Sequence, residues 1–384
     1  ASPMTTLFSY GFRPFFLGAA LFAGVAIPAW ILILAGTGDP VLLSAARDWH
    51  VHEMLFGFLP AVIAGFLLTA VPNWTDRPAI QGRELMLLFA LWLAGRVAMA
   101  IPLITPMFAA IVDAAFLVAL VGLLWRELAA GNSWRHAPVG LAISLYAAAN
   151  VTFHVLTVRG AETELALRLA LALDLFLLTF IGGRLTPNFT REFLAGQGKN
   201  ERPAPFSRFD GLSLALVHMA ALAWTVQPAA ATGWIFLAAG TVNLGRLLRW
   251  YGWLTWREPL VLSLHVGYGW LALSMLVLGG ALLGIGLAKE DAVHALTTGA
   301  VGAMTLAVMT RASLGHTGRP KQAGPATVCM YLLVSLGAAL RVFGPGTGLP
   351  TNLVLGSAGA AWSGAYLLFA LVYGPYLVRP SLDE

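Results

Sequence analysis

The sequence predicts an all-α protein that crosses a membrane many times, and three observations lead there: composition, long apolar runs and the placement of basic residues. Of the 384 residues, 58% are hydrophobic and only 11% are charged, with a mean hydropathy of +0.77. Soluble domains carry about 25% charged residues. The 41 glycines agree with this class, because small residues let membrane helices pack closely. We therefore expect lipid around the chain and exclude nucleic acid as a partner.

Twelve apolar runs are long enough to cross a bilayer, whose core needs about 20 apolar residues per helix. Because backbone in lipid must satisfy its own hydrogen bonds, each run is expected to be helical. The first run is long enough to stay in the membrane, so it is not expected to be a cleaved leader. The expected spans are residues 12–36, 48–71, 83–104, 106–126, 138–158, 164–185, 209–226, 232–254, 259–286, 292–312, 325–343 and 350–378. Together they form one transmembrane domain over residues 1–384.

Basic residues fall unevenly on the two sides of these spans, which predicts the orientation. With the N-terminus inside, the outer ends hold six of the 23 basic residues: Arg47, Arg96, Arg159, Arg168, Lys289 and Arg341. The other 17 lie at inner ends and in inner loops. Since short cytoplasmic loops carry an excess of Lys and Arg, both termini are expected in the cytoplasm.

Histidines near one face of the membrane are the leading candidates for a functional site. His50, His52, His154 and His294 all lie toward the outer ends of their spans. Ionisable groups inside a membrane are costly and usually functional, and imidazole binds iron, copper and zinc. The single cysteine, Cys329, excludes a cysteine metal site. These observations predict haem or metal binding, with a hydrogen-bonded structural role as the alternative for any one histidine.

The stretch "WHVHE" combines two of these histidines with a glutamate. On a helix of 3.6 residues per turn, His50 and His52 project about 200° apart. They are therefore expected to serve two different sites, or His50 precedes the helix. Glu53 shares a face with His50 and is the expected outer-side proton donor. Asp113 and Asp174 also lie within spans; for Asp174, proton transfer and pairing with an arginine or a hydroxyl stay open.

Three similar motifs recur every four spans and indicate an internal repeat. "AVPNWT", "RLTPNFT" and "RASLGHT" each end in threonine, at Thr75, Thr190 and Thr317, with an arginine close behind. The pattern predicts three four-helix units, over residues 12–126, 138–254 and 259–378. Counting back 23 residues from the first and third threonines gives His52 and His294. Facing helices at these positions would offer axial ligands from opposite sides of one porphyrin.

Longer motifs carry a resemblance to a known family. "WHVHEMLFGFLPAVIAGFLLTAVPNWT", "GGRLTPNFTR", "LHVGYGW" and "HALTTGAVGAMTLAVMTRASLGHTGRP" resemble the NnrS family. That family consists of bacterial inner-membrane proteins that contain haem and copper and are linked to nitric oxide and denitrification. The resemblance implies haem b, with copper or a second haem, and a role in nitrosative stress. Its motif histidines fall on His50, His52, His265, His294 and His316.

Twelve helices in three groups also resemble the arrangement of haem-copper oxidases and nitric oxide reductases. In those proteins the second and tenth helices supply the axial ligands of a low-spin haem. A shared fold does not by itself fix a function. This chain lacks the expected histidine pair after the sixth span, so no standard copper or non-haem iron centre is expected there.

The histidine pattern predicts a haem-bearing membrane protein, and the resemblance implies that it binds nitric oxide and acts on it as an oxidoreductase. The electron donor and oligomeric state are left open. The expected haem-binding residues are His52, His294, His50 and His265. The expected residues for a second metal are His50, His154 and His316. One alternative is a non-catalytic nitric oxide sensor or scavenger. Another is a transporter for metal, haem or a small solute, although transporters place their polar groups near the midplane rather than near one face.

Overall fold

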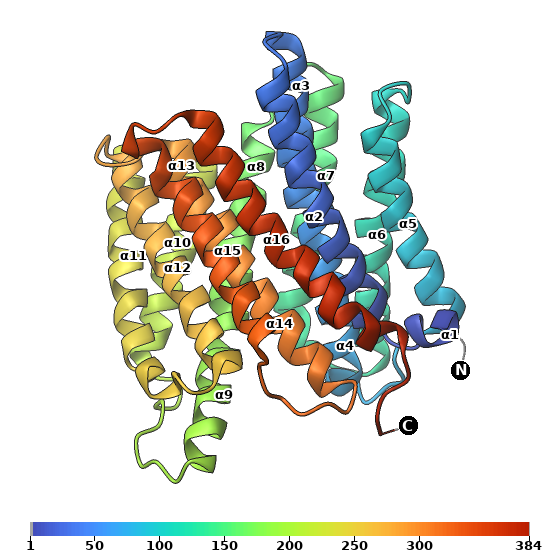
Figure 1. Cartoon of the computed structure of the whole chain (residues 1–384), viewed down its shortest axis with the longest axis vertical. Helices are drawn as coiled ribbons and strands as arrows, with labels where there is room; N and C mark the ends of the chain where they lie inside the picture. The colour runs from blue at the N-terminus through green and yellow to red at the C-terminus, as the bar shows by residue number, and fades with distance from the viewer. Residues whose placement is uncertain (1–2, 384) are drawn as a thin grey trace. The chain divides into compact units, whose positions relative to one another are not determined.

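The computed structural model describes residues 3–383, and every regular element among them is a helix (Figure 1). The first nine are α1 (Pro3–Leu7), α2 (Phe12–Gly36), α3 (Pro40–His52), α4 (Leu59–Thr75), α5 (Gly82–Ala100), α6 (Pro106–Ala130), α7 (Ala137–Val158), α8 (Glu164–Leu177) and α9 (Gly183–Gly196). The remainder are α10 (Arg208–Val226), α11 (Ala230–Leu248), α12 (Pro259–Leu282), α13 (Lys289–His294), α14 (Gly302–Gly315), α15 (Pro325–Phe343) and α16 (Thr351–Val378). Short 3-10 turns occupy Trp134–His136, Gly252–Thr255 and Gly344–Thr347.

Several long helices begin with a polar residue followed by proline. The Asp39 side chain accepts a hydrogen bond from the backbone N–H of Val41 at 2.9 Å, at the start of α3. Thr105 caps α6 and Glu258 caps α12 in the same way. These caps satisfy N–H groups that have no partner within the helix, and proline at the first helical position removes another unpaired donor.

Ten helices within residues 3–383 are long and apolar enough to cross a membrane, which confirms a multi-pass membrane protein. The other two expected spans, 83–104 and 232–254, also coincide with helices, α5 and α11. Each of these two helices carries a buried arginine, Arg96 in α5 and Arg246 in α11. A buried charge makes a span less apolar without making it solvent-exposed. The count of twelve spans and the three-fold repeat stay predictions.

Wider π-helical turns interrupt three of the long helices in the described chain. η1 (Glu53–Phe58) joins α3 to α4, η3 (Leu178–Gly182) joins α8 to α9, and η5 (Ala295–Val301) joins α13 to α14. The first and the third begin directly after His52 and His294, the two histidines that the sequence pairs by position. Such turns are rare and are frequent at functional sites.

The helices form two compact units. Unit 1 consists of residues 1–173, 312–319 and 369–384, and unit 2 consists of residues 174–311 and 320–368. In unit 1 the last segment of the chain is tied to the start of α2, because Arg13 donates to the backbone carbonyls of Leu377 at 2.9 Å and Arg379 at 2.8 Å. The Arg13 side chain is buried, and these carbonyls lie at the end of α16, where a cation is favoured by the helix dipole.

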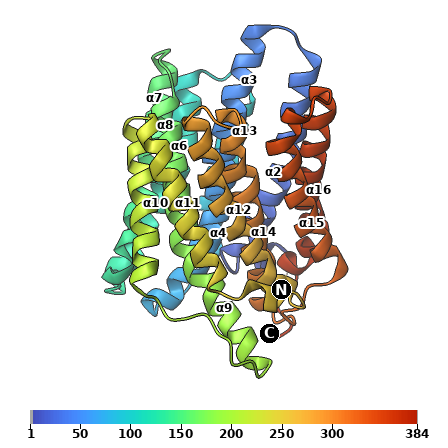
Figure 2. The ribbon, with the colours of Figure 1, turned by 90° about the vertical axis from the view of Figure 1, so that its left-hand side faces the viewer.

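Unit 2 contains α10, α11 and α12, which pack against one another in sequence order (Figure 2). Buried apolar side chains such as Phe236 and Met275 fill this unit. Met304 of α14 lies against Gly267 of α12 and Gly182 of η3, where any larger side chain would collide with it. Close packing against glycine is the usual way in which membrane helices approach one another.

Candidate functional site

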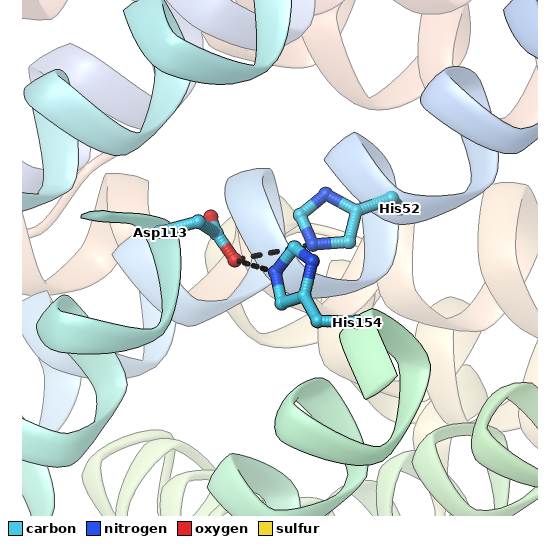
Figure 3. Close-up of side chains that lie close together, drawn as sticks. All are labelled: His52, Asp113 and His154. Carbon is cyan, nitrogen blue, oxygen red and sulfur yellow. Dashed lines mark hydrogen bonds and ion pairs between the residues drawn. The ribbon is translucent and has the colours of Figure 1, made fainter. Parts of the chain in front are cut away.

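Five segments of unit 1 bring polar side chains to one buried cluster. The cluster residues are His52 from α3, Glu53 from η1, Arg96 from α5, Asp113 from α6, and Asn150 and His154 from α7. His52 and Glu53 are 0% exposed. Figure 3 shows the rings of His52 and His154 pointing toward the same carboxylate, that of Asp113. An apolar span would not enclose so many ionisable groups unless they compensated one another.

His52 is hydrogen-bonded through both of its ring nitrogens. Nδ1 lies 2.8 Å from Oε1 of Glu53, and Nε2 lies 3.0 Å from Oδ1 of Asn150 and 3.2 Å from Oδ2 of Asp113. All of these partners are oxygen acceptors, so both nitrogens donate and the ring carries a positive charge in this arrangement. His52 therefore acts as a cation between two carboxylates.

Asp113 is the acceptor at the centre of the cluster. Its Oδ2 accepts from Nε2 of His154 at 2.7 Å and from Nδ2 of Asn150 at 2.9 Å. Its Oδ1 accepts from the guanidinium of Arg96. Asn150 and His154 are four residues apart on α7, which places them on one face of the helix. Both oxygens of Asp113 are thus fully used, one by the arginine and the other by side chains of α3 and α7.

Arg96 links the two acids of the cluster. It donates to Oε1 of Glu53 at 2.6 Å and to Asp113. The guanidinium fits because residue 57 is glycine; a Cβ there would collide with it. The charges of Glu53 and Asp113 are then balanced by those of Arg96 and His52, which lowers the cost of burying them.

The π-helical turn η1 gives Glu53 its place in the cluster. A wider turn disturbs the regular helical ladder, so backbone carbonyls need other donors. The hydroxyl of Tyr146 donates to the carbonyl of Leu55 at 2.6 Å, and Nε1 of Trp92 donates to the carbonyl of Gly57 at 2.9 Å. Side chains from α7 and α5 therefore stabilise the turn that carries Glu53.

One carboxylate oxygen of Glu53 is left without a hydrogen bond among the described residues. Its Oε1 binds His52 and Arg96, whereas Oε2 is buried without a hydrogen-bond partner among the described residues. A buried acceptor without a partner costs free energy, and such atoms in native structures call for an explanation. Oε2 of Glu53 is where a proton or a bound molecule would complete the site.

The other expected site histidines lie outside this cluster or in unit 2. In unit 1, the His50 ring stacks on Trp30 with centroids 5.1 Å apart, and His316 lies 5.9 Å from the ring of Tyr10. His50 and His52 thus have different surroundings, as their 200° separation predicts. In unit 2, Nδ1 of His294 lies 2.5 Å from the carbonyl of its own helix at Glu290.

His265 of unit 2 is held by a threonine. The hydroxyl of Thr190 donates to the carbonyl of Thr186 at 2.7 Å, so its oxygen accepts from Nε2 of His265, also at 2.7 Å. Nδ1 of His265 then carries the lone pair, and it has no hydrogen-bond partner among the described residues. The expected neighbour, Tyr268, belongs to a different set of contacts.

Those contacts form a second buried network, centred on Arg246 of α11. Arg246 donates to Oδ1 of Asp210 at 2.8 Å and to the hydroxyl of Tyr268 at 2.9 Å. Tyr268 in turn donates to Oδ1 of Asn243 at 2.6 Å. The guanidinium lies against Gly183, where a Cβ would collide with it. This network contains no histidine among its described members, and each hydrogen bond in it closes within unit 2.

Sequence reasoning did not assign Arg96, Asp113 and Asn150 to the site. A usable signal was present, because α5 and α6 are joined by a short loop and form an antiparallel pair. Arg96 stands five residues before that loop begins at 101, and Asp113 eight residues after it ends at 105. Opposite charges at similar depth on adjacent spans are expected to pair.

Fold and site together define a class: a multi-pass helical membrane protein with a buried His–Asp–His group that could hold a metal ion. Residues 6–381, nearly the whole chain, match the family model described as NnrS protein, so the chain belongs to the NnrS family. The resemblance carried by the sequence motifs is thereby confirmed, and it associates the chain with nitric-oxide-related membrane proteins. No curated protein matches the chain.

Proposed function

We propose that this protein carries haem b in the bacterial inner membrane and binds and reduces nitric oxide, as protection in nitrosative stress or denitrification. The observation that supports this proposal most is the buried cluster around His52 and Glu53, within a chain of the NnrS family. Charged groups enclosed in apolar spans are the usual mark of proton or electron chemistry in a membrane. The excess of basic residues on one side supports cytoplasmic termini.

His265 and His294 of unit 2 are residues that would hold a haem. A ligating histidine commonly donates its second ring nitrogen to a carbonyl or hydroxyl, which fixes the tautomer. The contact of Nε2 of His265 with Thr190 leaves Nδ1 of His265 as the nitrogen that would bind the iron. Nδ1 of His294 is in contact with the Glu290 carbonyl. Bound haem would supply an iron that binds nitric oxide and passes electrons. Copper or a second haem held by other histidines belongs to the same proposal.

The cluster in unit 1 supplies protons in this proposal. Two molecules of nitric oxide, two electrons and two protons give one nitrous oxide and one water. Glu53 holds a proton at Oε2, the oxygen without a partner, and passes it on as a general acid. Nδ1 of His52 lies 2.8 Å from Oε1 of Glu53, so His52 can return a proton to Glu53.

The test combines an optical spectrum with a turnover assay on the purified protein. We expect a b-type haem spectrum after reduction with dithionite, a shift of its bands on adding nitric oxide, and nitrous oxide formation with an artificial electron donor. Glu53→Gln removes the proton while keeping the shape of the side chain. It should lower the rate by about 10²-fold or more, the usual contribution of a general acid, with haem content unchanged.

Glu201→Gln, in the exposed loop before α10, is the matched control and should keep the wild-type rate. If Glu53→Gln also keeps it, Glu53 is not on the proton path. Haem and nitric oxide binding without any nitrous oxide would show a sensor or scavenger instead. A protein that stays free of haem after haem-supplemented expression would rule out the proposal. The histidines would then have a role in transport or in the structure.

A further inference from the structure

We infer that Nε2 of His52, Nε2 of His154 and Oδ2 of Asp113 bind a divalent first-row transition metal, of the ferrous type, as a non-haem site in unit 1. The three residues could hold a metal, and their ligand atoms all lie within 4.8 Å of one another. The inference stands on this geometry and does not depend on nitric oxide turnover.

The chemistry of the donors selects the metal. Two imidazoles and one carboxylate form the ligand set typical of non-haem ferrous iron, with other coordination positions open to small molecules. Copper(I) is favoured by thiolate and thioether donors, and none of the three ligands is of either kind. Among first-row metals, cobalt(II) prefers the same donors and has visible absorption bands, so it can serve as a probe.

The spacing of the donor atoms already approaches that of a metal site. Metal–ligand bonds of about 2.1 Å place neighbouring ligand atoms roughly 3.0 to 3.4 Å apart. Oδ2 of Asp113 lies 3.2 Å from Nε2 of His52 and 2.7 Å from Nε2 of His154. Both imidazole nitrogens point at the same carboxylate oxygen (Figure 3). A metal ion would take the place of the two Nε2 protons with small movements of the side chains.

The surrounding residues support the ligands as they do in known metal sites. Glu53 accepts from Nδ1 of His52, which is the carboxylate–histidine–metal arrangement that fixes the tautomer and orients the ring. Arg96 binds the other oxygen of Asp113, so Oδ2 is held ready as a single ligand. With both histidines neutral, the two carboxylates and Arg96 leave one net negative charge, which favours a cation.

A purely structural cluster explains these contacts less well. In unit 2 the ion pairs of Asp210 are formed by two arginines, Arg246 and Arg249. In unit 1 two additional histidines converge on an acid that an arginine already binds. One Nε2 lone pair binds one metal, so this assignment takes His52 for the non-haem metal and leaves His294 to haem.

The first experiment measures cobalt(II) binding to the full-length protein after chelation, with X-ray absorption at the cobalt edge. We expect one cobalt per chain and the scattering pattern of imidazole ligands. Wild-type protein that binds no stoichiometric cobalt, or binds it without imidazole scattering, overturns the inference. This measurement uses no variant, so it does not depend on the folding of any substituted protein.

The second experiment compares His154→Gln and Asp113→Asn with His218→Gln. His218 lies exposed on α10 and bonds a carbonyl of its own helix, so it is a matched control. Loss of one ligand should weaken cobalt binding at least about 10-fold, with the haem spectrum unchanged. Equal cobalt affinity in all three variants, or loss of haem rather than cobalt from the first two, would overturn the assignment. Metal content and haem content are separate readouts, so this inference and the proposed function can fail independently.

Discussion

Each unit of this protein contains a buried arginine that pairs with an aspartate, Arg96 in unit 1 and Arg246 in unit 2, and these two arginines are used differently. Arg96 and Arg246 both pair with an aspartate, and both lie against a glycine in or next to a π-helical turn, Gly57 or Gly183. The Arg246 network closes on the hydroxyl of Tyr268, which hydrogen-bonds onward to an asparagine. The Arg96 network instead includes two histidines, His52 and His154, and Glu53, whose Oε2 has no hydrogen-bond partner among the described residues.

The two networks differ in what surrounds the buried arginine–aspartate pair. A buried arginine–aspartate pair stabilises packed helices only when every polar atom has a partner. In unit 2 the neighbours are a second arginine, Arg249, and the neutral groups of Ser207, Tyr268 and Asn243. In unit 1 the neighbours are groups that change protonation or bind metals, and the arginine keeps their charges balanced. Substitutions in the Arg96 network and in the Arg246 network should therefore have different effects.

The largest effect is expected from removing either arginine. Arg96→Met or Arg246→Met removes one partner of a buried ion pair, which costs about 3–5 kcal/mol. Arg96→Met should be the worse of the two, because it leaves the two acids Glu53 and Asp113 with His52 as their cation, whereas Asp210 alone loses a partner in unit 2 and keeps Arg249. Unfolding of each variant in detergent, followed by tryptophan fluorescence, measures the loss. If Arg246→Met were as unstable as Arg96→Met, Arg246 would stabilise as much buried charge as Arg96, and the distinction between the two networks would be wrong.

An intermediate effect is expected from filling the space beside each guanidinium. Gly57→Ala and Gly183→Ala force the arginine away, with an overpacking cost of about 1–3 kcal/mol each. Only Gly57→Ala should also weaken cobalt(II) binding, because only Arg96 holds a proposed metal ligand. Gly122→Ala has open space around it and should be neutral or slightly stabilising. Thermal unfolding and cobalt titration on the same samples decide whether the two glycines differ in this way.

The smallest effect is expected from Tyr268→Phe. The change removes the hydrogen bonds to Arg246 and Asn243 while keeping the ring. Hydrogen bonds between helices in membrane proteins contribute on the order of 1 kcal/mol, so stability should fall by about that amount. Haem content, cobalt affinity and nitrous oxide formation should stay at wild-type levels. A change in any of these three quantities would show that the Arg246 network has a functional role as well as a structural one.

Much of the fold could be predicted from the sequence, because apolar runs of membrane length have few alternatives to helix. Ten of the expected spans were confirmed on this basis. The π-helical turns could not be predicted, since their sequences contain ordinary helix-forming residues and glycine. Helical periodicity therefore places Glu53 on the face of His50, whereas in the structure Glu53 hydrogen-bonds to His52, one residue away.

The candidate site was predictable where charge stood out from an apolar background. His52, His154 and Glu53 were expected at a site near one face, and they lie together in unit 1. Asn150 could not be found, because a single asparagine in an apolar run gives no sign of its partners. Arg96 was interpreted as a topology marker, since the inside–outside distribution of arginine gives no information on burial.

The contact between Arg13 and the final segment of the chain has a consequence for synthesis. Ribosomes deliver the N-terminal helices to the membrane first, so Arg13 enters the membrane long before its carbonyl partners at Leu377 and Arg379 exist. Until then its charge must be met by water, lipid headgroups or a chaperone. The helices that carry the His52 cluster are made early, yet unit 1 is complete only after translation reaches its last residues. In an unfinished copy, the guanidinium at the start of α2 has therefore not yet been buried by the end of the chain.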